Sequence, residues 1–132
     1  MTESLGALVG SRWEPLLSEG FLVTLEEPGR VVLDSDRASV TVGASPRGEV
    51  EVMVMPLGSG WPRQWSWSGM VGRADVGRLL ELALDRMRAE PPILLGEANF
   101  YDRLAVGNRA ASHALTRQDE GKGSSTVERR LP

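Results

Sequence analysis

Residues 37–55 read RASVTVGASPRGEVEVMVM, and this stretch decides the fold. Apolar residues alternate with polar or smaller ones through residues 38–42 and again through residues 50–54. A period of two places successive side chains on opposite faces, which is the pattern of a β-strand with one buried face. Residues 45–48, Ser-Pro-Arg-Gly, are turn formers, so the stretch predicts an antiparallel hairpin.

Two shorter alternating segments precede this hairpin. The first, residues 21–26, is expected to place Phe21, Val23 and Leu25 on one side of a strand. The second, residues 30–33, follows a Pro-Gly turn, and an Asp-Ser-Asp turn leads from it into the hairpin. The sequence therefore predicts an antiparallel meander of at least four strands.

Helical periodicity brackets the predicted sheet. Before it, apolar residues at three- and four-residue spacing predict a helix over residues 5–17, kinked or restarted near Trp13 because the Pro15 ring clashes with the preceding turn. After it, helices are expected over residues 74–90 and from residue 97 to residue 113 or beyond. The inward-facing residues of the last helix are expected to be Phe100, Leu104, Ala111 and Leu115.

These elements predict an α+β fold, an antiparallel four- to five-stranded meander with an N-terminal helix and two C-terminal helices packed on one face. A single domain is expected over residues 1–116. Residues 117–132 are polar and poor in apolar side chains, so a disordered C-terminal tail is expected there.

Composition limits the classes of function. The chain has 132 residues and no cysteine, which excludes disulfides, thiolate metal sites and cysteine nucleophiles. The formal net charge of −3 argues against a nucleic-acid partner. No apolar run approaches the ~20 residues of a membrane span, and the N-terminus does not resemble a secretory signal, so no membrane partner and a cytoplasmic location are expected. Arginine replaces lysine almost throughout, which indicates the GC-rich genome of a bacterium such as an actinobacterium.

The second face of the predicted sheet is unusual. One face is uniformly apolar and carries the core, whereas the other mixes serine, threonine and glutamate with Leu22, Val32, Met53 and Met55. This mixture is too apolar for a plain solvent face and too polar for a core. We expect something to cover it: a segment of the chain, a second copy or a partner.

A tryptophan-rich stretch follows the meander. Trp61, Arg63, Trp65 and Trp67 lie within seven residues, and tryptophan and arginine are the side chains that dominate protein-binding surfaces. These four residues, with the apolar residues of the second face, form the expected partner-binding surface. The alternative is that Trp65 and Trp67 lie on one side of a short fifth strand and cap the core, with the intervening serines pointing outward.

Several groups of polar residues have ordinary structural explanations. The Asp34/Asp36 pair suits a hard cation but equally suits a turn. Glu49 and Glu51 share one strand face and are more often solvated, neutralised by arginines across the sheet, than catalytic. His113, the only histidine, is expected at the surface near a helix end. No catalytic, cofactor or metal site is therefore expected.

One resemblance bears on function. The segment VVLDSDRASVTV at 31–42, followed by PRGEV at 46–50 and later by GEANFYDRL at 96–104, resembles small bacterial immunity-protein-like domains. Such proteins occur beside toxin genes, so the resemblance implies a toxin as the partner. It covers roughly residues 20–105. Ala44-Ser45 replaces the aspartate that these proteins have before the Pro46 turn, so no role of that aspartate carries over.

The sequence thus predicts a non-catalytic protein-binding module, of the immunity or toxin-neutralising type. A secretion-chaperone-like dimer is an alternative that uses the same sheet face for self-association. A small-ligand-binding or enzymatic domain is another, and it requires Asp34, Glu49 or Glu51 to lie in a concave site beside Trp65.

Overall fold

The computed structural model describes residues 4–71 and 75–123, with side chains as far as Ala114, and it confirms the α+β class. The elements in chain order are α1 (Leu5–Arg12), α2 (Glu14–Ser18), β1 (Leu22–Glu27), β2 (Arg30–Asp34), β3 (Ala38–Ala44), β4 (Glu49–Pro56), β5 (Trp65–Met70), α3 (Val76–Ala89), α4 (Pro91–Leu95) and α5 (Ala98–Gly123).

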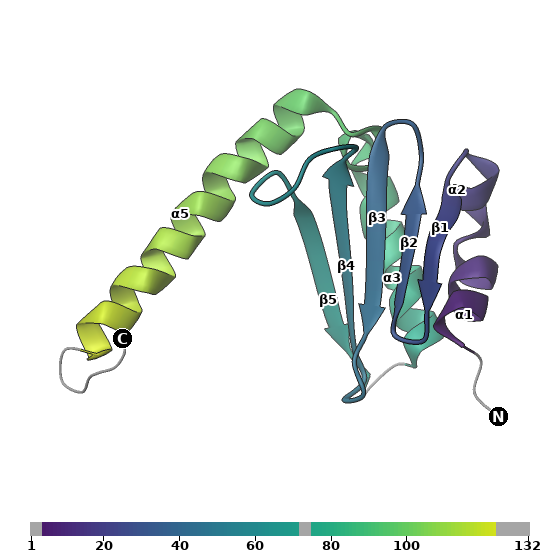
Figure 1. Cartoon of the computed structure of the whole chain (residues 1–132), viewed down its shortest axis with the longest axis horizontal. Helices are drawn as coiled ribbons and strands as arrows, with labels where there is room; N and C mark the ends of the chain where they lie inside the picture. Colours follow the sequence, from purple (N-terminus) through teal and green to yellow (C-terminus); the bar gives the residue numbers. More distant parts are fainter. Residues whose placement is uncertain (1–3, 72–74, 124–132) are drawn as a thin grey trace.

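The five strands form one antiparallel sheet in the order β1-β2-β3-β4-β5 (Figure 1). The predicted alternation holds in its centre, because Val40 and Val42 of β3 pair with Val54 and Val52 of β4 on the buried face. Gly48 closes the turn between these strands with a positive φ of 86° that favours glycine. The hairpin that decides the fold is therefore also the middle of the core.

Strand β1 departs from the predicted pattern. Its register against β2 shifts between Val23 and Leu25, so Val23 pairs with Leu33 of the buried face whereas Leu25 pairs with Val32 of the other face. Phe21 is buried as expected. The prediction that Phe21, Val23 and Leu25 share one side was wrong for Leu25, because a bulge inserts one residue and inverts the alternation after it.

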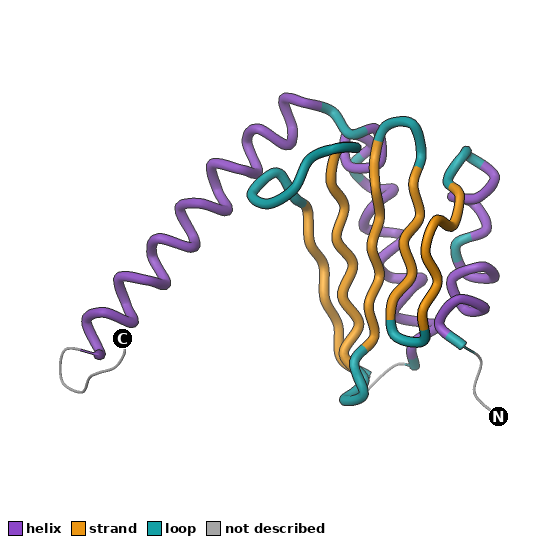
Figure 2. Tube along the Cα trace, in the orientation of Figure 1, coloured by secondary structure: helices purple, strands orange, loops and turns teal. Residues whose placement is uncertain are grey.

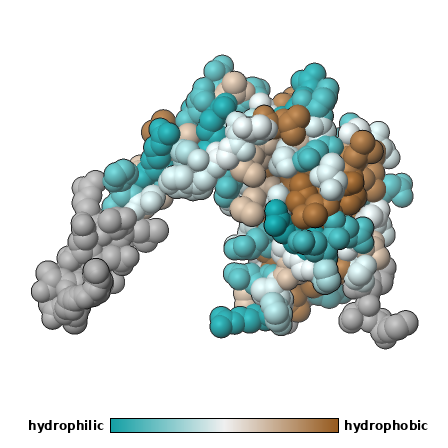
Figure 3. Space-filling model, viewed as in Figure 1, coloured by the Kyte–Doolittle hydropathy of each residue, from teal (hydrophilic) through white to brown (hydrophobic). Residues whose placement is uncertain are grey.

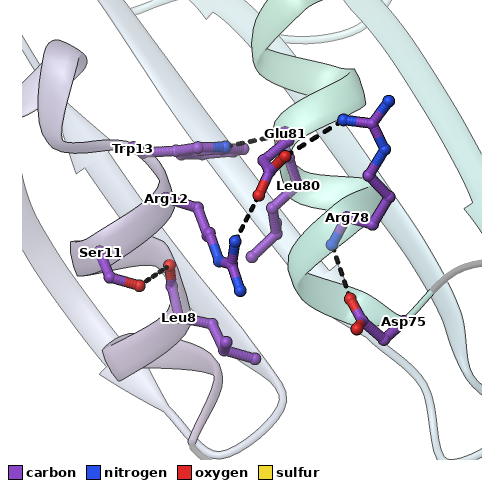
Figure 4. A network of polar contacts seen from close by, with 8 residues as sticks. All are labelled: Leu8, Ser11, Arg12, Trp13, Asp75, Arg78, Leu80 and Glu81. Atoms are coloured by element: carbon purple, nitrogen blue, oxygen red, sulfur yellow. Dashed lines mark hydrogen bonds and ion pairs between the residues drawn. The ribbon is translucent and has the colours of Figure 1, made fainter.

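Helices α1, α2 and α3 lie behind the sheet in Figure 1 and cover one face of it. The predicted interruption occurs at Trp13, between α1 and α2, with a proline in the first turn of α2. The Trp13 side chain is fully buried, and its Nε1 donates to the carbonyl oxygen of Leu80 at 2.8 Å. Figure 4 shows this bond beside a surface cluster in which Arg12 and Arg78 both pair with Glu81. These contacts hold α1 against α3.

The C-terminal helices differ from the expectation in two ways. A short helix, α4, begins at the Pro91-Pro92 pair that ends α3, since proline is tolerated in a first helical turn. Helix α5 continues to Gly123 without interruption, so residues 117–123 are helical where a tail was expected. Good helix formers dominate residues 109–120, and neither glycine nor proline interrupts them. The rest of the expected tail, 124–132, lies outside the described residues.

Only the beginning of α5 packs against the domain. Tyr101 and Ala105 are buried, whereas the predicted inward residues Phe100 and Leu104 are half-buried and Ala111 is exposed. The expected inward stripe is therefore rotated, and the side chain of Leu115 lies outside the described ones. Figures 1 and 2 show α5 leaving the body near the β5 edge and projecting away from it.

Tyr101 provides a test of this packing. It is the only tyrosine in the chain, and its hydroxyl donates to the carbonyl oxygen of Ile93 at 2.7 Å. Burial raises the pKa of the Tyr101 phenol above its ordinary value. The buried phenol therefore contributes fully to the free energy of unfolding at pH values below about 10, the pKa of tyrosine in the unfolded chain. This contribution is lost progressively as the pH rises above that value.

An alkaline titration followed by the ultraviolet absorbance of tyrosinate checks this expectation. In the folded protein we expect no tyrosinate at about pH 10, whereas the chain in denaturant is half ionised there. Half-ionisation at that pH in the folded protein would show that Tyr101 is solvated.

Candidate functional site

The candidate site is the sheet face opposite helices α1–α3, which no described helix covers; we call it the open face (Figure 1). We assigned residues to the open face from the cross-strand pairing and from the alternation of side chains along each strand. They are Leu22, Leu25, Glu27, Arg30, Val32, Asp34, Ser39, Thr41, Gly43, Glu49, Glu51, Met53, Met55, Ser66, Ser68 and Met70.

Apolar side chains occupy two adjacent rows across the open face. In one row Leu25, Val32, Thr41, Met53 and Ser66 are successive cross-strand partners. In the next row Leu22, Asp34, Ser39 and Met55 are successive partners. Among these, Leu22 is 69 % exposed. The structure therefore places the four apolar residues that the sequence singled out on one face, although Asp34 and Ser39 separate Leu22 from Met55 and Thr41 separates Val32 from Met53. Figure 3 shows hydrophobic and hydrophilic side chains side by side on this face.

The open face is hollowed rather than flat. A depression of about 460 Å³ is lined by Arg30, Glu51, Met53 and others, with Gly43 between the first two. Because Gly43 has no side chain, it leaves space between the guanidinium and the carboxylate. A second depression of about 240 Å³ shares Glu51 and Met53 and continues toward β5. Together the depressions form a shallow trough across β2 to β5.

Asp34 is an incompletely satisfied carboxylate on this face. Its Oδ2 accepts a hydrogen bond from Thr24 Oγ1 at 3.1 Å, while its Oδ1 is buried and has no hydrogen-bond partner in the described part of the chain. A buried carboxylate oxygen without a donor is costly, so Asp34 is a locally unfavourable group in this face of the sheet. Within residues 4–71 and 75–123, no three carboxylate or histidine side chains gather where a metal ion would bind.

The tryptophans do not join the open face. Trp65 and Trp67 pair with Val54 and Val52, which places both indole rings on the helix-covered face, where they are half-buried against the core. The serines between and after them face the open side. Trp65 and Trp67 therefore do not share a face with Leu22, Val32, Met53 and Met55, and they lie where the core-capping fifth strand would place them. Gly69 lies close to the Trp67 ring, because a Cβ atom added at position 69 would be 2.9 Å from an atom of that ring.

This placement also removes the geometry that the enzymatic alternative requires. Glu51 pairs with Ser68 and Asp34 with Ser39, so both carboxylates belong to the open face. The Trp65 ring lies on the opposite side of the sheet. Glu51 lines the depression of about 240 Å³ together with Trp67, whereas neither of the two depressions described above includes Trp65.

Trp61 and Arg63 lie in the loop between β4 and β5. Trp61 is 59 % exposed, whereas Arg63 is half-buried and its Nε lies 3.3 Å from Asp102 Oδ1 on α5, close enough for an ion pair although not aligned as a hydrogen bond. Asn108 of α5 donates from Nδ2 to the carbonyl oxygens of Pro62 (2.7 Å) and Gln64 (3.0 Å). Arg63 thus ties the loop to α5, and only Trp61 remains a candidate contact residue there.

Asn108 is a residue that sequence reasoning missed. A single asparagine within a helical segment carries no local signal of a partner 44 residues away. Its two bonds fix the direction in which α5 leaves the domain. The stretch beyond it, residues 109–123, we call the arm; its side chains are exposed as far as they are described, and Val106 just before it is 68 % exposed.

The comparisons with known proteins add no relative. No family model matches the chain, and no curated protein or solved structure matches it significantly. None of the helices in the described part of the chain has the length and apolar character needed to cross a membrane.

Proposed function

We propose that the protein is a non-catalytic protein-binding module and that the open face is its contact surface. The observation that carries the proposal is the pair of adjacent apolar rows containing Leu22, Val32, Met53 and Met55, which no described helix covers. Contiguous apolar side chains rimmed by polar ones are typical of protein–protein contact surfaces. Methionine adapts its shape to a partner, which suits two methionines near the centre of the trough.

The charges of the open face indicate what kind of protein binds. Its charged members are Glu27, Arg30, Asp34, Glu49 and Glu51, so acidic side chains outnumber basic ones. A partner with a basic contact surface would be attracted over a distance and oriented on arrival. The resemblance to immunity-protein-like domains points to a bacterial toxin as this partner.

Substitution of Met53 by glutamate tests the proposal. A carboxylate in the apolar row would have to be desolvated against the partner, so binding is expected to weaken by about tenfold or more. The matched control is Leu95→Glu, which adds the same charge at an exposed leucine of α4, off the open face. Both variants are first compared with the unchanged protein by circular dichroism and urea unfolding.

The measurement is affinity capture from a lysate of the native host, followed by titration of the captured protein against each variant. The proposal predicts that the unchanged chain and Leu95→Glu capture the same protein and that Met53→Glu loses it. Equal capture by folded Met53→Glu would contradict the proposal and would move the search to the Trp61 loop.

A homodimer, as in secretion chaperones, is the second candidate. The arm favours it, because a helical extension into water gains stability when a partner covers it.

A further inference from the structure

We infer that, in the absence of another partner, the arm of a second copy lies across the open face, and that the protein forms a reciprocal dimer by exchange of arms. This inference rests on the proposed function, because it assigns a protein occupant to the same face. Three observations support it: the length of the arm, its charge and the direction of α5.

The arm is a helical extension that projects from the domain (Figure 1). Residues 109–123 continue α5 for about 21 Å at 1.5 Å per residue. Residues Arg109–Ala114 are all exposed. An isolated helix of about 15 residues is marginal in water, so a cover would account for its persistence. The five strands span about 19 Å from β1 to β5 at the usual spacing, so the arm matches the width of the sheet.

The arm and the open face carry opposite charge. The arm holds three basic residues, Arg109, Arg117 and Lys122, and two acidic ones, Asp119 and Glu120, so it is basic by one charge and its first ten residues contain no acidic side chain. The open face is predominantly acidic. No ion pair within the described residues involves Arg103 or Arg109. An arm laid on the open face would bring its arginines close to the exposed carboxylates of Glu49 and Glu51.

The occupant cannot come from the same copy. Helix α5 is continuous from Ala98 to Gly123, and Asn108 fixes its direction through Pro62 and Gln64. Figure 1 shows it diverging from the β5 edge, so an unbroken helix does not return over its own sheet. Two copies related by a two-fold axis instead place each arm over the other copy's sheet. The small side chains of Ala110 and Ala114 allow the helix to approach the strands closely.

Cross-linking between two single-cysteine variants tests the inference, because the chain has no cysteine of its own. One variant carries Met53→Cys on the open face and the other carries Ala114→Cys on the arm. After mixing, a short bis-maleimide is expected to join them about tenfold more efficiently than it joins the control pair, Leu95→Cys with Ala114→Cys. Denaturing electrophoresis detects the product as a covalent dimer.

Analytical ultracentrifugation of the full chain provides the second measurement. A dimer is expected, and Arg109→Glu should raise its dissociation constant by about tenfold while the exposed-arginine control Arg86→Glu does not. A monomer at the cross-linking concentration, or equal cross-linking of the test and control pairs, would overturn the arm exchange. Either result would leave the proposed function standing, because that is tested separately by the capture experiment with Met53→Glu.

Discussion

Replacement of Trp13 by alanine is expected to lower the free energy of unfolding by about 3–5 kcal/mol, the usual loss for a fully buried aromatic residue. Trp13 lies at the break between α1 and α2, is wholly buried and donates to the Leu80 carbonyl oxygen of α3. The substitution removes both the packing of the ring and the hydrogen bond that holds the N-terminal helices against α3. Since a small domain has about 5–15 kcal/mol in total, little stability should remain.

Urea unfolding followed by far-ultraviolet circular dichroism measures this loss. The matched control is Trp61→Ala, which makes the same chemical change at a ring that is 59 % exposed. We expect the control to change stability by no more than about 0.5 kcal/mol. Similar losses in both variants would show that burial does not distinguish the two tryptophans.

Replacement of Gly96 by alanine is expected to cost about 2–4 kcal/mol, the sum of a left-handed backbone penalty and a steric clash. Gly96 ends α4 with φ 62° and ψ 34°, a conformation that favours glycine. A Cβ at this position would also press directly against the carbonyl oxygen of Arg37. Backbone at this contact cannot rotate away as a flexible side chain would, so α5 would have to shift.

Gly10→Ala in α1 is the matched control, measured by the same urea unfolding. No atom lies within 4 Å of a Cβ built at Gly10, and its φ is not positive. Alanine there should stabilise the helix by about 0.5–1 kcal/mol. If Gly96→Ala proved as harmless as Gly10→Ala, the α4–α5 junction would not be packed against the backbone of Arg37 and Pro56.

The sheet was predictable because its signals are local. Alternation through Val40, Val42, Val50 and Val52 and the turn at Gly48 lie within one short stretch, and each indicates the same hairpin. The apolar content of the open face was predictable for the same reason, since the residues between the core valines must point the other way. Met53 and Met55 therefore lie where the pattern predicts.

The errors arose where a contact distant in sequence decides the geometry. The β1 bulge follows from the pairing of β1 with β2, and it moves Leu25 to the open face. Trp65 and Trp67 belong to the core face because they pair with Val54 and Val52 of β4. The amino-acid composition of the segment does not reveal this pairing. Asn108 directs α5 through two carbonyl groups of the loop before β5.

The arm and an outside partner would compete for one face. A dimer with exchanged arms hides the apolar rows of the open face until a protein with a stronger basic contact surface displaces Arg109 and its neighbours. If only a fraction of the molecules exposes the open face, the apparent affinity for an outside partner falls in proportion to that fraction. Such a loss disfavours partners that bind weakly and nonspecifically.

Methionine methyl NMR tests the central claim, that the open face contacts protein, most directly. Of the five methionines, Met53, Met55 and Met70 lie on the open face, with Met53 and Met55 on β4 and Met70 at the end of the edge strand β5, while Met87 is fully buried in the core and serves as an internal reference. Spectra of [methyl-¹³C]methionine-labelled protein are compared before and after addition of the captured partner. The account predicts that the signals of Met53 and Met55 shift or broaden while that of Met87 is unchanged. Binding that leaves the Met53 and Met55 signals unchanged would contradict it.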